Sequence, residues 1–78
     1  MRYNERFKQE CILLGKHITK LREERNMTIK ELSIKTGIRP QYLKKIEAGI
    51  AYRVSLTKHL LKIAKSLKIT ISELFSYK

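Results

Sequence analysis

The side chains best suited to chemistry in this 78-residue chain stand close together, in the segment RPQYLKK. A helix predicted over residues 40–48 buries Leu43 and Ile46, which leaves long hydrogen-bonding side chains on its opposite side. These are Gln41, Tyr42, Lys44 and Lys45. Side chains in such a row can donate hydrogen bonds to acceptor groups along a partner molecule. A surface helix merely solvated by lysine has the same pattern, so the neighbouring segments decide between these interpretations.

The segments before this row predict two short helices joined by a tight turn, over about residues 28–48. Thr28, followed three residues later by Glu31, forms a capping box that marks a helix start. Gly37 supplies the turn, because glycine adopts left-handed backbone conformations at little cost. Pro40 fits the first position of the second helix, where its missing N–H costs nothing. Together these signals predict a helix-turn-helix that presents its second helix.

The charge of the chain indicates a polyanionic partner. Eighteen Lys and Arg residues against seven Asp and Glu residues give a net charge of +11 and a pI near 10.1. Basic residues are spread from Arg2 to Lys78, so they do not form a tail on a neutral domain. Lysine can also serve only to solvate a surface. Because so large an excess costs self-repulsion, we favour a nucleic-acid partner.

The sequence predicts no catalytic residue, no metal site and no cofactor, so we do not expect an enzyme. His17 and His59 have no Cys or carboxylate beside them at metal-ligand spacing, and we expect both to be surface or packing residues. Cys11 lies on an apolar stripe, where packing is its expected role. The three glycines are isolated, so they form no phosphate-binding loop.

The single cysteine excludes an intrachain disulfide and fits a reducing, cytoplasmic location. Charges at Glu5, Lys8 and Glu10 argue against a signal peptide. No apolar run of about 18 residues is present, so we expect no membrane span.

Apolar spacing predicts the remaining helices. Apolar residues near the N-terminus follow one another at steps of 4, 4, 3, 4 and 3, and this stripe comprises Tyr3, Phe7, Cys11, Leu14, Ile18 and Leu21. The spacing predicts one long helix from an N-cap at Asn4 to about Arg25, ended by Asn26. A start near Gly15 behind a looser arm is the alternative. A second stripe predicts a helix from residue 56 or 57, comprising Leu56, Leu60, Ile63, Ala64 and Leu67. Thr70 and Glu73 form another capping box, which opens a short last helix.

Residues from about 14 to 75 resemble the Cro/cI-type (XRE-like) helix-turn-helix family of prokaryotic and phage transcription regulators. The matching stretches are LGKHITKLREERNMT, IKELSIKTGIRPQYLKKIEAG and SLTKHLLKIAKSLKITISELF. The resemblance implies an all-α, compact five-helix lambda-repressor-like domain over residues 14–78, after an N-terminal extension over residues 1–13 that continues the first helix. It further implies a homodimer that binds duplex DNA at an operator and regulates transcription, and we expect a repressor. The recognition helix over residues 40–48 would lie in the major groove.

The resemblance also implies roles for particular residues. The base-facing positions are Pro40, Gln41 and Lys45, flanked by Tyr42 and Lys44. Gln41 is suited to pair with adenine and Lys45 with guanine. The expected contacts with the DNA backbone are Thr28 and Ile29 at a helix start, and Tyr52 and Arg53 in the following loop. Arg22 and Glu47 match an internal ion pair, and Phe75 and Tyr77 are candidate anchors of the dimer interface.

The sequence departs from the family pattern in four places. Ile29 replaces a common Gln, and Arg39 stands at the helix N-cap in place of Ser or Thr, which brings a guanidinium to the DNA surface. The loop over residues 50–55 is longer than usual, and Lys68 replaces a common Gly, which predicts a strained cap.

Two further functions remain open at this stage. The same fold serves antitoxins and restriction–modification controllers, for which a protein partner such as a toxin or polymerase is expected. The N-terminal segment with Tyr3, Phe7 and Cys11 would be the spare surface for that partner. RNA or membrane binding is disfavoured, because the tyrosines are few and dispersed and the apolar stripes are all needed for one core.

Overall fold

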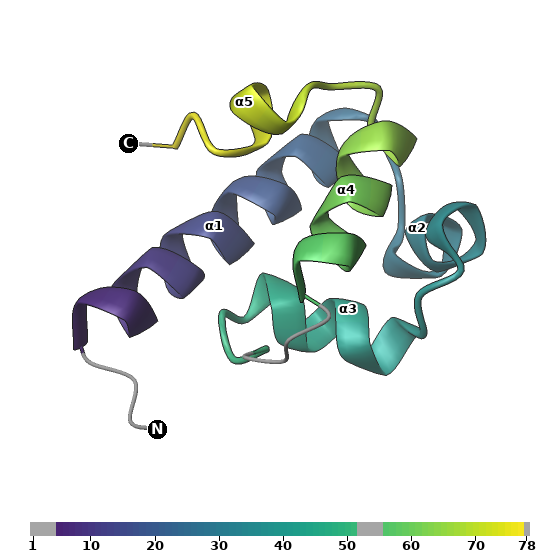
Figure 1. Cartoon of the computed structure of the whole chain (residues 1–78). Coiled ribbons are helices and arrows are strands. Elements are labelled where there is room, and N and C mark those ends of the chain that lie inside the picture. The colour runs from purple at the N-terminus through teal and green to yellow at the C-terminus, as the bar shows by residue number, and fades with distance from the viewer. Residues whose placement is uncertain (1–4, 52–55, 78) are drawn as a thin grey trace.

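The computed structural model describes residues 5–51 and 56–77, and within these ranges the chain is all-helical. Five helices follow one another: α1 (Glu5–Glu24), α2 (Ile29–Thr36), α3 (Pro40–Glu47), α4 (Leu56–Ser66) and α5 (Ile71–Leu74) (Figure 1). The predicted five-helix fold is therefore confirmed. The positions of Tyr3, Asn4, Tyr52 and Arg53 lie outside the described residues. None of the described helices is long and apolar enough to cross a membrane.

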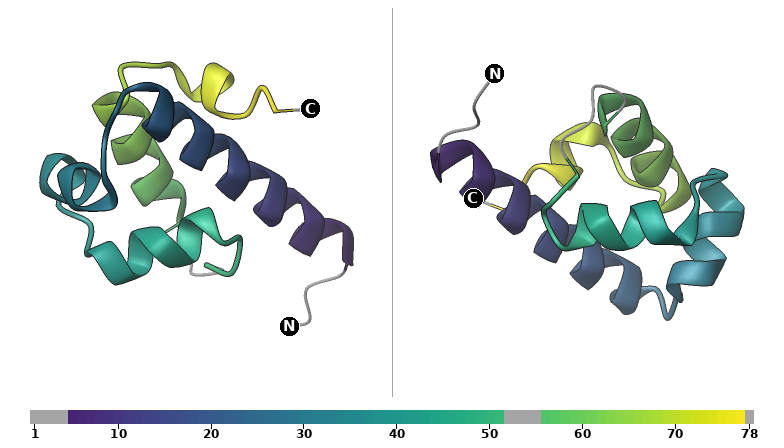
Figure 2. Two further views of the ribbon diagram at one scale, coloured as in Figure 1. Left: turned by 180° about the vertical axis from the view of Figure 1, so that it is seen from behind. Right: turned by 90° about the horizontal axis from the view of Figure 1, so that it is seen from below.

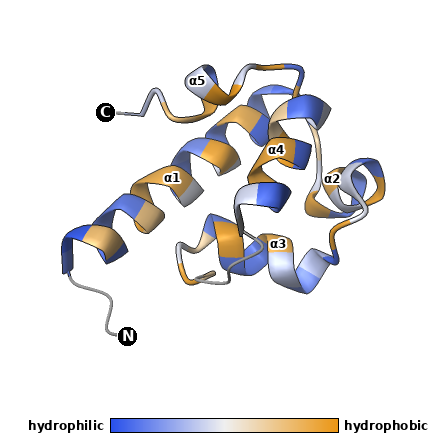
Figure 3. Cartoon of the chain, viewed as in Figure 1, coloured by the Kyte–Doolittle hydropathy of each residue, from blue (hydrophilic) through white to orange (hydrophobic). Residues whose placement is uncertain are grey.

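The helices surround one apolar core. Helix α1 packs against α3 and α5, while α2 packs against α3 and α4. Figure 2 shows that α3 and α5 lie on opposite sides of the molecule, with α1 and α4 between them. The largest completely buried side chains come from every helix and from the residue that follows α4: Ile18, Leu32, Leu43, Ile63, Leu67 and Leu74. Hydrophilic and hydrophobic residues alternate along the helices (Figure 3), and several large apolar side chains, such as Ile34 and Leu61, are exposed.

Helix α1 is one continuous helix of 20 residues, as the longer of the two alternatives predicted. The middle of its apolar stripe is buried, at Leu14 and Ile18, but Phe7 near its start is 39% exposed. Cys11 is half-buried, and burial together with the nearby Glu10 raises the pKa of its thiol. The stripe therefore continues beyond the core at the N-terminal end of α1.

Glycine allows α1 to approach α3 closely. Gly15 is buried in α1, and a Cβ atom added to it would lie 2.6 Å from the carbonyl oxygen of Ile46 in α3. Gly49, just after α3, has a φ of 78°, and an added Cβ would lie 2.6 Å from the Cα of Ile12. These two contacts hold the C-terminal end of α3 against the middle of α1.

The helix ends match the capping signals in the sequence. Both capping boxes are formed, at Thr28 with Glu31 and at Thr70 with Glu73. Asn26 ends α1 in the left-handed region, with a φ of 52°. Lys68 after α4 has a φ of 59°, so the strained cap expected there is confirmed. A left-handed conformation costs a residue other than glycine about 1–2 kcal/mol.

Candidate nucleic-acid interface

Helix α3 turns one side to the core and the other to solvent. Leu43 and Ile46 are buried, whereas five residues at its N-terminal end and along its outer side are exposed. These are Arg39, Pro40, Gln41, Lys44 and Lys45. Pro40 occupies the first helical position, and Arg39 is the N-cap with no side-chain hydrogen bond to the helix. The guanidinium of Arg39 is therefore not used in capping, as the sequence predicted.

The turn before α3 is fixed by hydrogen bonds within the motif. Gly37 has a φ of 76°, and its N–H donates to the carbonyl of Ser33 at 2.8 Å. The Ser33 hydroxyl donates to the carbonyl of Ile38 at 2.5 Å. The N–H of Ile38 donates to the Thr36 hydroxyl at 3.1 Å, and this hydroxyl donates to the carbonyl of Leu32 at 2.8 Å. These bonds satisfy the polar groups of the turn and fix the direction of α3.

The sequence analysis did not identify the hydroxyls of Ser33 and Thr36 as parts of this turn. The signal that points to them is general: Ser and Thr hydroxyls often bond to nearby backbone groups at helix ends. Here both hydroxyls lie where the chain turns from α2 to α3.

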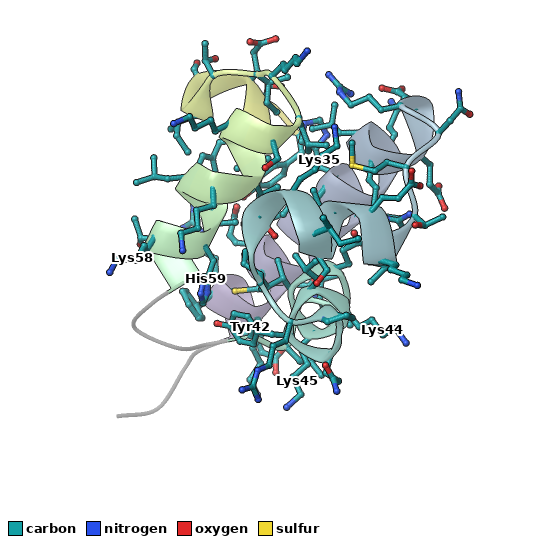
Figure 4. The ribbon with its side chains drawn as sticks, turned by 90° about the vertical axis from the view of Figure 1, so that its right-hand side faces the viewer. Lys35, Tyr42, Lys44, Lys45, Lys58 and His59 are labelled. Atoms are coloured by element: carbon teal, nitrogen blue, oxygen red, sulfur yellow. The ribbon has the colours of Figure 1, made fainter. Side chains whose placement is uncertain are left out.

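Tyr42 does not lie on the outer side of α3, and the prediction that placed it there is wrong. Its side chain is half-buried and packs against the core. The physical reason is helical spacing: Tyr42 precedes the buried Ile46 by four residues, so the two side chains share one side of the helix. The Tyr42 ring contacts His59 of α4, with centroids 4.8 Å apart and planes at 66° (Figure 4).

A groove of about 510 Å³ opens between the start of α3 and α4. It is lined by Gly37, Ile38, Arg39, Gln41, Tyr42, Lys45 and His59. The groove therefore joins residues predicted to face DNA bases with a histidine that the sequence placed only on a surface or in packing. His59 does pack, against Tyr42, but it also forms one wall of the groove.

At the start of α2, the groups available to a DNA phosphate are backbone N–H donors, and the side chain of Ile29 is not one of these groups. The Ile29 side chain is half-buried and packs against the core, so the backbone N–H is the group that Ile29 offers to a DNA phosphate. The exposed Thr28 and Glu31 complete the capping box, with N–H to oxygen distances of 2.9 and 3.1 Å. The N–H of Thr28, bonded to the Glu31 carboxylate, lowers the pKa of that carboxyl. The first N–H groups of the helix, at Ile29 and Lys30, remain suited to an anion.

Arg22 and Glu47 form the internal ion pair that the resemblance implied. The pair is bidentate, with Nε–Oε2 at 2.8 Å and Nη2–Oε1 at 3.1 Å. Thr19 donates to Oε1 of Glu47 at 2.7 Å, and Arg22 Nη1 donates to the carbonyl of Met27 at 2.7 Å. The hydrogen bond to Glu47 raises the pKa of Arg22. This network joins α1, the α1–α2 loop and the last residue of α3.

The C-terminal segment contacts α1. The Tyr77 hydroxyl donates to Oε2 of Glu10 at 2.9 Å, and burial together with this carboxylate raises the pKa of Tyr77 to about 12. His17 lies 3.1 Å from the carbonyl oxygen of Glu73 through Nε2. Of the two predicted dimer anchors, Phe75 is exposed and Tyr77 is bonded within the chain. In the described part of the chain, no three His, Cys, Asp or Glu residues lie together as metal ligands would.

A five-helix fold whose third helix exposes a polar, basic side after a fixed turn defines a helix-turn-helix DNA-binding domain. The family model of the Cro/C1-type HTH DNA-binding domain matches residues 17–78, and the chain belongs to this family. The resemblance inferred from sequence is thereby confirmed.

Two known proteins illustrate the relationship. The HTH-type transcriptional regulator SlrR of Bacillus subtilis (strain 168) is 30% identical over 63 residues, which cover 81% of this chain and 41% of the relative. The chain thus spans less than half the length of that regulator. The crystal structure of the restriction-modification controller protein C.AhdI from Aeromonas hydrophila superposes with a TM-score of 0.77 at 27% identity, covering 85% of this chain and 97% of the other.

Proposed function

We propose that this chain is a sequence-specific regulator of transcription that binds duplex DNA as a homodimer and represses by occupying an operator. The observation that carries the proposal is the exposed side of α3, where Gln41, Lys44 and Lys45 point away from the core on a helix fixed at both ends. A helix of this kind fits the major groove, with its N-terminal residues nearest the base edges.

Each exposed group has a role that its chemistry supports. Gln41 can form a bidentate pair with adenine, and Lys45 can donate to guanine O6 and N7. Arg39 and Lys44 are exposed, and their cationic side chains can contact phosphates. The N–H groups at the start of α2 supply a further phosphate site, since helix N-termini attract anions. The net charge of +11 also attracts the polyanionic DNA over a longer range, before these contacts form.

The Arg22–Glu47 network and the Gly15 contact support this function indirectly. Both hold the C-terminal end of α3 against α1. The turn bonds at Ser33 and Thr36 hold the N-terminal end. Side chains that read bases must be held within a fraction of an ångström, so a rigid support contributes to specificity.

The homodimer is proposed from symmetry. Two recognition helices about one DNA turn apart read an inverted repeat, which one helix of eight residues cannot do alone. The exposed Phe75, which is the C-cap residue of α5, is the proposed anchor, and α5 lies on the side of the molecule away from α3 (Figure 2). A restriction–modification controller is the second candidate, favoured by the similarity to C.AhdI over nearly the whole of that chain. An antitoxin of the same fold has no comparable observation behind it.

We expect Lys45→Ala to relax base preference at one position of each half-site. Loss of a specific base contact costs about 1–3 kcal/mol at that position, while the preferences at other positions stay unchanged. Sequencing of duplexes selected from a randomised pool by the wild type and the variant measures this. Lys20→Ala is the matched control, because it removes the same charge from an exposed position on α1. Identical selectivity profiles for Lys45→Ala and Lys20→Ala would exclude base reading by Lys45.

A further inference from the structure

The groove between α3 and α4 has a histidine in its wall. His59 comes from α4 and points toward Tyr42 of α3 (Figure 4), and the two rings meet edge to face at 4.8 Å. The Nδ1 atom of His59 is buried and has no hydrogen-bond partner among the residues that the structure describes. The ring thus packs against Tyr42, and its Nδ1 atom lacks the acceptor that a charged imidazolium would require there.

The surroundings of His59 are basic. Arg39 and Lys45 line the same groove from α3 and its N-cap, and no carboxylate is found among the described residues that line it. On α4 itself, Lys58 and Lys62 flank His59. Burial first, and then these two lysines, lower the pKa of His59, so the free protein holds a neutral imidazole at neutral pH. A groove with two permanent cations and a neutral histidine is a site for an anion.

We propose that this groove receives the sugar–phosphate backbone of the bound DNA, and that His59 takes up a proton as a phosphate enters. The proposal rests on the proposed function, because Gln41 and Lys45 line the groove and are also the side chains proposed to contact bases. A strand that offers its bases to these two side chains carries its phosphates past the mouth of the groove. The phosphate then supplies the negative charge that the free protein lacks beside His59.

The sign of the pH dependence follows from this exchange. The phosphate raises the pKa of His59 in the complex above its value in the free protein. Between these two pKa values the complex holds one more proton per protomer, so DNA affinity increases as the pH falls. Uptake of one proton can increase DNA affinity by at most about tenfold for each unit by which the pH falls. Above the pKa of His59 in the complex, the histidine is neutral in both the free and the bound protein. Below its pKa in the free protein, it is charged in both. DNA affinity therefore does not depend on the protonation of His59 outside this pH range.

The test compares three proteins on one duplex selected by the wild type. Dissociation constants are measured from about pH 8 to about pH 5.5 at constant salt, because phosphate contacts are salt-dependent. The chain has only two histidines, so His59→Gln and His17→Gln form a complete pair of variants. His17 is the matched control, since it lies beside Glu73 near the C-terminus and outside the groove.

We expect wild type and His17→Gln to bind several-fold more tightly at about pH 6 than at about pH 8, and His59→Gln to lose this change. The NMR-detected pKa of His59 should also rise when the duplex is added to wild type, which needs no variant. Sequence-specific binding with no pH dependence, or an unchanged pKa of His59 in the complex, would overturn the inference alone. Absence of binding to any duplex would overturn the proposed function as well.

Discussion

Replacing Gly15 by alanine is expected to destabilise the protein by about 3 kcal/mol, although alanine favours a helix by about 1 kcal/mol over glycine. The new Cβ atom would lie 2.6 Å from the carbonyl oxygen of Ile46 and close to that of Glu47. Both obstacles are backbone atoms, which cannot rotate away as a side chain does. Helix α1 must therefore move away from α3, and the packing of both helices is lost. Urea unfolding followed by circular dichroism measures the change.

Gly37→Ala is the matched control for this substitution. Gly37 has a φ of 76°, but no atom lies within 4 Å of an added Cβ. Its cost is therefore limited to left-handed strain, about 1–2 kcal/mol. A Gly15→Ala protein as stable as the wild type, or more stable, would show that α1 and α3 do not approach as closely as described.

Replacing Glu47 by alanine is expected to cost about 3 kcal/mol of unfolding free energy. The side chains of Arg22 and Glu47 are only 12% and 10% exposed, so removal of the carboxylate leaves a nearly buried guanidinium without its counter-charge. The Thr19 hydroxyl loses an acceptor at the same time. Denaturant unfolding of the variant measures the loss, and the double variant Arg22→Met with Glu47→Leu should recover part of it, because no unpaired charge remains.

Glu24→Ala serves as the control for net charge. Glu24 is exposed at the end of α1, and surface substitutions of this kind change stability by about 0.5 kcal/mol or less. If Glu47→Ala costs no more than Glu24→Ala, the ion pair contributes nothing beyond ordinary surface electrostatics.

Much of the fold could be predicted because its signals are local. The capping boxes at Thr28 and Thr70, the left-handed Gly37 and the first-turn Pro40 each concern residues within one helical turn. Local rules of this kind indicate where helices begin and end. The Arg22–Glu47 pair is not local, and only the family resemblance indicated it.

The remainder depended on contacts between segments far apart in the chain. From the sequence alone, Gly15 looks like a residue that destabilises a helix. No neighbouring residue indicates that the backbone of α3 packs directly against it. Spacing places Tyr42 on the same side of α3 as Ile46, but its contact with the ring of His59 depends on how α4 packs against α3. The groove with His59 requires α4 to lie beside the start of α3, and no local pattern predicts that placement.

The direct test of α3 as a DNA-reading helix is selection of duplexes from a randomised pool by the purified wild-type chain at near-physiological salt. A homodimer that reads bases through α3 should recover an inverted repeat, with half-sites about one helical turn apart. Recovery of duplexes with no enriched sequence would mean that the net charge of +11 binds DNA without base reading, which would contradict the proposed function.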